Sequence, residues 1–282
     1  MPAPTPPFLE RALRDKAAWV AHFDHATLPV LTSTALALEE LRANEDAVDA
    51  HMLAESIGND PLMTLKLLAH VAHLRRGREG SEVETVTEAL VMLGIPPFFR
   101  AFGAQETVDQ RLAGHPEALD GFDTVLSRSH RAARFAIGFA VHRMDPDAAV
   151  IHEAALLHDF AELLLWLHAP ALALQIRQQQ ACDATLRSVS VQQALLNVEL
   201  GDLQHALMEA WRLPSLLVRI TDDHAPAMTS QLRNVLLAIR VARHSAHGWD
   251  NAALPDDLRE ISELLLLSAD ATARLLQEID AD

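Results

Sequence analysis

Apolar residues recur at helical spacing along most of the chain, and prolines separate many of the apolar stretches. Runs such as FLERALRDKAAWVAHF place apolar side chains on one face of an α-helix. Strand alternation is nowhere sustained. Leu and Ala dominate the composition, and both are good apolar helix formers. The sequence therefore predicts an all-α protein.

The expected helices fill both halves of the 282 residues. In the first half the pattern predicts helices over residues 8–23, 33–42, 49–58, 61–74 and 86–94. In the second half it predicts helices over residues 122–142, 148–167, 170–182, 188–197, 199–212, 214–223, 230–247 and 256–279. The segment GHPEALDG, within residues 110–122, is expected to link two packed helical lobes.

Charge and cysteine content exclude several classes of function. A formal net charge of −16 argues against general nucleic-acid binding, because such affinity comes largely from Lys and Arg on phosphates. No run is long enough to span a bilayer, and the Pro-rich start lacks the pattern of a signal peptide. The single cysteine, Cys182, excludes an internal disulfide and a thiolate zinc site, and we interpret it as an inert thiol. A cytoplasmic protein is expected.

The dipeptide His158-Asp159, in the run EAALLHDFAELLLW, is the clearest candidate for chemistry. A neutral imidazole and a carboxylate are both good ligands for a divalent metal. The nearby His152-Glu153 begins like the helix of a zinc protease, but Leu156 stands where that motif requires a second His.

Several separate stretches resemble the HDOD family, a branch of the HD-domain superfamily found in bacterial signalling. LPVLTSTALALEEL resembles the start of the family, AESIGNDPLMTLKLL its Asp-Pro segment, and VETVTEALVMLGI the stretch before its Leu-Gly turn. SHRAARFA resembles the first His-bearing helix, and ALLHDFAELLLW the HD segment. AWRLPSLLVRITDDHAP is similar to the Trp-x-Leu-Pro segment and its downstream His pair. These stretches follow the family's order.

This resemblance implies an all-α regulatory fold of two packed helical lobes, of which the second is HD-domain-like. We expect residues 1–26 to form a Pro-rich segment and a helix, and residues 27–226 to form the HDOD domain, with lobes at about 27–110 and 122–226. Residues 227–282 are expected to be C-terminal helices that pack on the HD-like lobe, with a homodimer contact as the alternative.

The HD superfamily contains metal-dependent phosphohydrolases, and this chain matches only part of their ligand set. His130 resembles the first His, and His158 and Asp159 match the pair. The distal carboxylate belongs to an Ala-Asp dipeptide, but here Arg243 follows Ala242. An Arg side chain has no lone pair to offer a cation.

Two more departures fall at positions that related two-metal enzymes use. Leu200 stands where they carry a His eleven residues before the Trp, here Trp211. Asp223 replaces the first member of the downstream His pair and is an alternative ligand. The resemblance, with these departures, predicts a vestigial metal site formed by His130, His158 and Asp159, and no cofactor.

We interpret the chain as a non-enzymatic signal-transduction module that binds a protein partner of unknown identity. Two alternatives stay open. One is a phosphohydrolase that uses His130, His158, Asp159 and Asp223 with a divalent metal such as Mn or Fe. The other is a nucleotide-binding regulator without hydrolysis, with Arg243 on a phosphate. As a structural role, His158 and Asp159 are expected to join His130 in a buried polar cluster that ties helices together.

Overall fold

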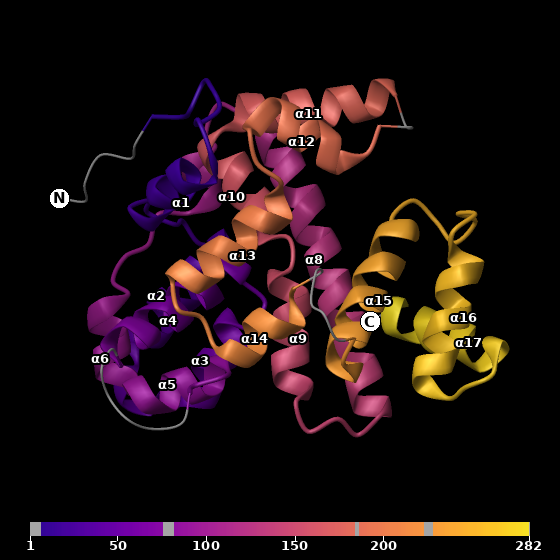
Figure 1. Cartoon of the computed structure of the whole chain (residues 1–282). Coiled ribbons are helices and arrows are strands. Elements are labelled where there is room, and N and C mark those ends of the chain that lie inside the picture. The colour runs from indigo at the N-terminus through magenta and orange to yellow at the C-terminus, as the bar shows by residue number, and fades with distance from the viewer. Residues whose placement is uncertain (1–6, 76–81, 184–185, 223–227, 282) are drawn as a thin grey trace. The chain divides into compact units, whose positions relative to one another are not determined.

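A computed structural model describes residues 7–75, 82–183, 186–222 and 228–281, and these residues form an all-α protein (Figure 1). The predicted fold class is confirmed. The described residues contain no strand beyond an isolated bridge between Val30 and Thr107. The helices are α1 (Lys16–Asp24), α2 (Thr32–Ala43), the 3₁₀ helix η1 (Glu45–Ala47), α3 (Ala50–Ile57), α4 (Pro61–Leu74), α5 (Val86–Leu93), α6 (Ile95–Ala101), α7 (Val108–Arg111), α8 (Pro116–His142), α9 (Ala148–Leu157), α10 (Phe160–His168), α11 (Pro170–Cys182), α12 (Ser188–Leu196), α13 (Leu200–Ala210), α14 (Ser215–Ile220), α15 (Ser230–His244), α16 (Leu254–Leu265) and α17 (Ala269–Ala281).

The chain forms two compact units, and each of them combines two separate stretches of sequence. The first unit consists of Met1–Val125 with Asp159–Pro214, and the second of Leu126–His158 with Ser215–Asp282. The expected domain limits at residues 27–226 and 227–282 stay a prediction. None of the described helices is both apolar enough and long enough to cross a membrane.

Aspartates begin two helices of the first unit as the sequence predicts. Asp49 accepts a hydrogen bond from the Met52 N–H at 2.8 Å. Asp60, which is buried, accepts from the Leu62 and Met63 N–H groups at 2.9 and 3.0 Å. These contacts satisfy N–H groups that have no partner within the helix.

The predicted first helix over residues 8–23 is wrong at its start, because α1 begins only at Lys16. Asp15 caps it by accepting from the Ala18 N–H at 2.8 Å. The residues before it are held by other parts of the first unit. The Leu9 N–H donates to the His168 carbonyl at 2.7 Å, and the side-chain amide of Asn197 donates to the Leu13 carbonyl at 3.0 Å.

Two further predicted segments differ from the structure. The expected linker GHPEALDG is largely helical, because α8 begins at Pro116, a residue that suits the first turn of a helix. The predicted helix over residues 256–279 is two helices, α16 and α17. Leu266 ends α16 with a left-handed backbone (φ 56°), which an α-helix cannot continue.

The first unit buries a large apolar core around Trp19, which is fully enclosed. The Trp19 indole N–H donates to the Leu196 carbonyl at 2.8 Å, so this polar atom is satisfied inside the core. Gly121 lies against the Trp166 ring in the same unit. A Cβ at residue 121 would lie 2.4 Å from that ring.

We expect Gly121→Ala to lower the free energy of unfolding by about 1–3 kcal/mol, because the buried Trp166 ring would have to move. Urea denaturation measures this change. Gly201→Ala is the matched control, since no atom lies within 4 Å of a Cβ added there and Ala favours the helix. Equal effects of the two substitutions would contradict the packing argument.

His168 makes the stability of the first unit depend on pH. Burial, together with the nearby His22 and Arg111, lowers the pKa of His168 from 6.5 to about 3. The folded chain therefore keeps His168 neutral, whereas the unfolded chain takes up a proton near pH 6.5.

We expect the stability contributed by neutral His168 to be complete above pH 6.5 and to be lost as the pH falls from 6.5 toward 3. By pH 5 the loss is about 2 kcal/mol. Urea denaturation at pH 7.5 and pH 5 measures it. His168→Leu should remove this difference, and replacement of the exposed His51 by Gln should keep it. An acid loss that persists in His168→Leu would refute the assignment.

Candidate functional site

The His158-Asp159 dipeptide lies between two helices and not inside one. His158 is the residue that ends α9, and Asp159 is the residue before the start of α10. The predicted continuous helix over residues 148–167 is therefore wrong at this point. Asp159 has φ −109° and ψ 20°, outside the main helical region, so the helical path is interrupted. Its carbonyl accepts from the Glu162 N–H at 3.0 Å, which starts the next helix.

The boundary between the two units falls inside this dipeptide. His158 belongs to the second unit, together with His130 and Arg243, whereas Asp159 and Leu200 belong to the first. Asp223 lies outside the described residues. The expected convergence of the full set stays a prediction.

The second unit places His130 on α8 and His158 at the end of α9, where 9% of the His158 surface is exposed. It also brings His152 of α9 near His130. Burial lowers the pKa of His152, and the His130 imidazole lowers it further. In the sequence, His152 stands out only as the start of an incomplete zinc-protease motif. His152 and His130 lie on two different helices, so no local sequence pattern signals that they are near one another.

Two of the expected ligand positions, those of Leu200 and Arg243, hold side chains that offer no lone pair to a metal. Leu200 is the first residue of α13 and is buried, so an apolar side chain occupies that position. Arg243 lies in the last turn of α15 and is exposed. Within each unit, the described His, Cys, Asp and Glu residues form no group of three or more that could hold a metal ion. Leu200 and Arg243 therefore add no ligand for a metal ion.

The helix that carries Arg243 is tied firmly to α8. The buried Asn234 donates through its side-chain amide to the Ala136 carbonyl at 3.2 Å. Arg131, next to His130, donates to the Ala242 carbonyl at 3.0 Å and pairs with Asp280 of α17 at 2.8 Å. Arg131 thus joins three helices of the second unit, a role that the sequence analysis missed.

An ion-pair cluster ties the same helix to α16. The carboxylate of Asp257 is fully buried and lies 2.7 Å from Arg240 and 2.5 Å from the imidazole of His244. Arg240 also pairs with Glu260 at 3.1 Å. The backbone at Arg243 is therefore held between α8 and α16. The spacing of Arg240 and His244 on one face of α15 is the only sequence signal for this cluster.

The family model of the HDOD domain matches residues 28–226 of the sequence. The chain belongs to the HDOD family. The resemblance found in the sequence is thereby confirmed. Among curated proteins, no relative matches this HDOD chain.

Solved structures share the fold of this HDOD protein over most of its length. The MmoQ response regulator of Methylococcus capsulatus is 20% identical with a TM-score of 0.68, and the match covers 89% of this chain and 98% of MmoQ. A virulence factor of Campylobacter jejuni is 16% identical with a TM-score of 0.65, over 94% of this chain and 98% of that protein. An HDOD domain protein of Geobacter sulfurreducens is 16% identical with a TM-score of 0.50, over 94% and 96%. At such identities the likeness shows the fold alone.

We expect Asp257→Asn to lower the free energy of unfolding by about 2 kcal/mol, because it leaves Arg240 without its buried counter-charge. Urea denaturation measures the loss. Asp256→Asn is the matched control. Asp256 is 71% exposed and pairs with Arg259 at the surface, so its replacement should cost less than about 1 kcal/mol. A neutral effect of Asp257→Asn would show that this cluster does not hold α15.

Proposed function

We propose that this HDOD protein is a non-enzymatic module of a bacterial signal-transduction pathway, acts in the cytoplasm by binding a signalling protein, and retains a vestigial HD metal site. The observation that carries the proposal is Arg243. It occupies the position where the superfamily carries its distal carboxylate ligand.

The chemistry of Arg243 opposes metal binding. A guanidinium group is permanently charged, offers only hydrogen-bond donors and repels a cation. The helix that carries it is fixed through Arg131 and Asp257, so a different placement of this backbone is costly. Leu200, at a second ligand position, adds no donor.

The regulatory part of the proposal draws on family membership and fold. MmoQ, which has the same fold, is named as a response regulator. Apart from the partial HD ligand set, the sequence indicates no catalytic group of residues. Since fold does not determine function, the choice between regulation and catalysis depends on the site residues and on experiment.

The phosphohydrolase alternative is favoured by the presence of His130, His158 and Asp159, which match three ligands of a working site. Under this alternative, these residues would hold a divalent metal, which would supply an activated water for attack on phosphorus. The nucleotide-binding alternative is favoured by the exposed guanidinium of Arg243, which can bind a phosphate in bidentate fashion.

The full-length chain, purified without oxygen and supplied with Fe²⁺ or Mn²⁺, separates these functions. We expect elemental analysis to find far less than one metal ion per chain after gel filtration. We also expect no hydrolysis of bis-p-nitrophenyl phosphate, because the ligand set is incomplete. One metal ion per chain that is lost in His158→Ala, together with hydrolysis, would establish the phosphohydrolase.

The matched control is His51→Ala, since His51 is exposed and is no candidate ligand. A thermal shift with nucleoside mono-, di- and triphosphates tests the third function. A shift that disappears in Arg243→Ala would establish nucleotide binding. No shift is the result that the proposal expects.

A further inference from the structure

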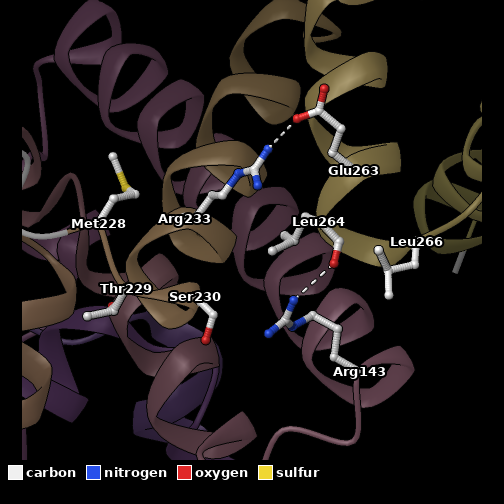
Figure 2. Close-up of a pocket in the computed structure, with 8 residues that line it drawn as sticks. All are labelled: Arg143, Met228, Thr229, Ser230, Arg233, Glu263, Leu264 and Leu266. Atoms are coloured by element: carbon white, nitrogen blue, oxygen red, sulfur yellow. Dashed lines mark hydrogen bonds and ion pairs between the residues drawn. The ribbon is translucent and has the colours of Figure 1, made fainter.

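An open hollow lies in the second unit, where the ends of α8 and α16 meet the start of α15 (Figure 2). Its volume is about 350 Å³. All of its lining residues belong to this one unit. They are Arg143, Met228, Thr229, Ser230, Arg233, Glu263, Leu264 and Leu266.

The hollow carries a net positive charge on a chain whose total is −16. The Arg143 side chain donates to the Leu264 carbonyl at 2.9 Å, and Arg233 pairs with Glu263 at 2.9 Å, as the dashed lines in Figure 2 show. Two guanidinium groups thus face one carboxylate. The Nε of Arg143 is buried and has no hydrogen-bond partner among the described residues. A group that accepts hydrogen bonds and carries negative charge complements this lining.

Highly exposed apolar side chains accompany the charges. Leu266 is 91% exposed and Met228 is 64% exposed, and both line the hollow. Met144, which follows Arg143 directly, is 88% exposed. Leu266 and Met144 gain almost nothing from packing within the folded chain, and most of the Met228 surface also stays in contact with solvent.

Two of these residues also have an unfavourable backbone. Met144 has φ 54° and Leu266 has φ 56°, and each follows the end of a helix. Glycine is the usual residue with this left-handed conformation, and a bulky side chain there is uncommon. Neither packing nor backbone geometry therefore explains a Met and a Leu at these positions. A contact with another molecule would explain them.

We propose that this surface, formed by Arg143, Met144, Met228, Arg233 and Leu266, is the docking surface for an acidic segment of a protein partner. A carboxylate of the partner enters the hollow between Arg143 and Arg233. Apolar side chains beside it pack on Met144, Met228 and Leu266. The inference rests on the proposed function as a protein-binding module and gives the chemistry of the partner.

The composition of the surface favours a protein over a small ligand. Met and Arg are enriched in protein interfaces, where a few apolar anchors combine with desolvated Arg contacts. The hollow is open, whereas pockets for small ligands enclose most of the ligand surface.

A random peptide library displayed on phage, selected on the immobilised full-length chain, tests the inference. We expect the enriched peptides to carry Asp or Glu next to Leu, Ile, Phe or Met. The affinity of a synthetic enriched peptide should fall at least about tenfold in Arg143→Glu and in Arg233→Glu. Arg259→Glu is the matched control, because it makes the same charge change at a 64% exposed position of α16 outside the hollow. The affinity of the peptide for Arg259→Glu should equal its affinity for the wild-type chain.

Glycine substitutions separate docking from folding. Leu266→Gly and Met144→Gly remove an exposed apolar side chain and relieve the left-handed backbone, so the Tm should stay equal or rise while the peptide binds more weakly. The control is Leu36→Ala, which removes a 63% exposed side chain from the first unit and should leave binding unchanged. Alanine is used here in place of glycine because Leu36 lies inside a helix. Arg233→Gln serves if a glutamate variant fails to fold.

Several results would overturn the inference. They are a selection that enriches no peptide, enriched peptides that are basic, and binding that survives all the substitutions of this surface. A dimer in sedimentation velocity that dissociates in Arg143→Glu would assign the surface to a second copy. Metal content and phosphodiesterase activity are measured on the same samples. If the chain holds no metal, has no activity and selects no peptide, the docking surface alone is refuted. If the chain binds metal and is active, the proposed function is refuted.

Discussion

The packing of the second unit depends on the contacts made by two groups, the buried carboxylate of Asp257 and the guanidinium of Arg131. Arg131 ties α15 to α8 and α17, and Asp257 ties α15 to α16. Helix α15 carries Arg243 in its last turn, while the hollow with Arg233 lies at its start. One fixed helix therefore sets the position of the residue that opposes metal binding and of the surface that we assign to a partner. Buried ion pairs of this kind are costly to break from one side.

The His158-Asp159 dipeptide has a structural role whatever its chemistry. It ends α9 and starts α10, and the division into two units passes between its two residues. In a metal-dependent HD site the same pair supplies two ligands. We propose that Leu200 and Arg243 stand at two further positions of such a site, and neither side chain can bind a cation. On this proposal the dipeptide identifies the ancestry of the fold more clearly than it identifies a reaction.

Local chemistry predicted most helices, and the exceptions have specific causes. Asp49 and Asp60 begin helices where the sequence indicated, because an N-terminal cap depends only on neighbouring residues. The helical pattern continues through Leu266 and through His158-Asp159, but the helix is interrupted at both places, and no Gly or Pro marks the break. The site could be predicted as a set of residue types from the family resemblance. The ties through Arg131 and Asp257 could not, since they join residues far apart in the sequence.

Titration of Mn²⁺ into the wild-type chain and into Arg243→Asp, followed by calorimetry, tests the central claim most directly. The substitution restores a carboxylate at the position of the lost ligand and changes no other candidate residue. The account predicts no stoichiometric binding to the wild-type chain and binding of about one ion to Arg243→Asp. Stoichiometric binding to the wild-type chain that Arg243→Asp leaves unchanged would contradict it, because Arg243 would then have no part in the loss of a metal site.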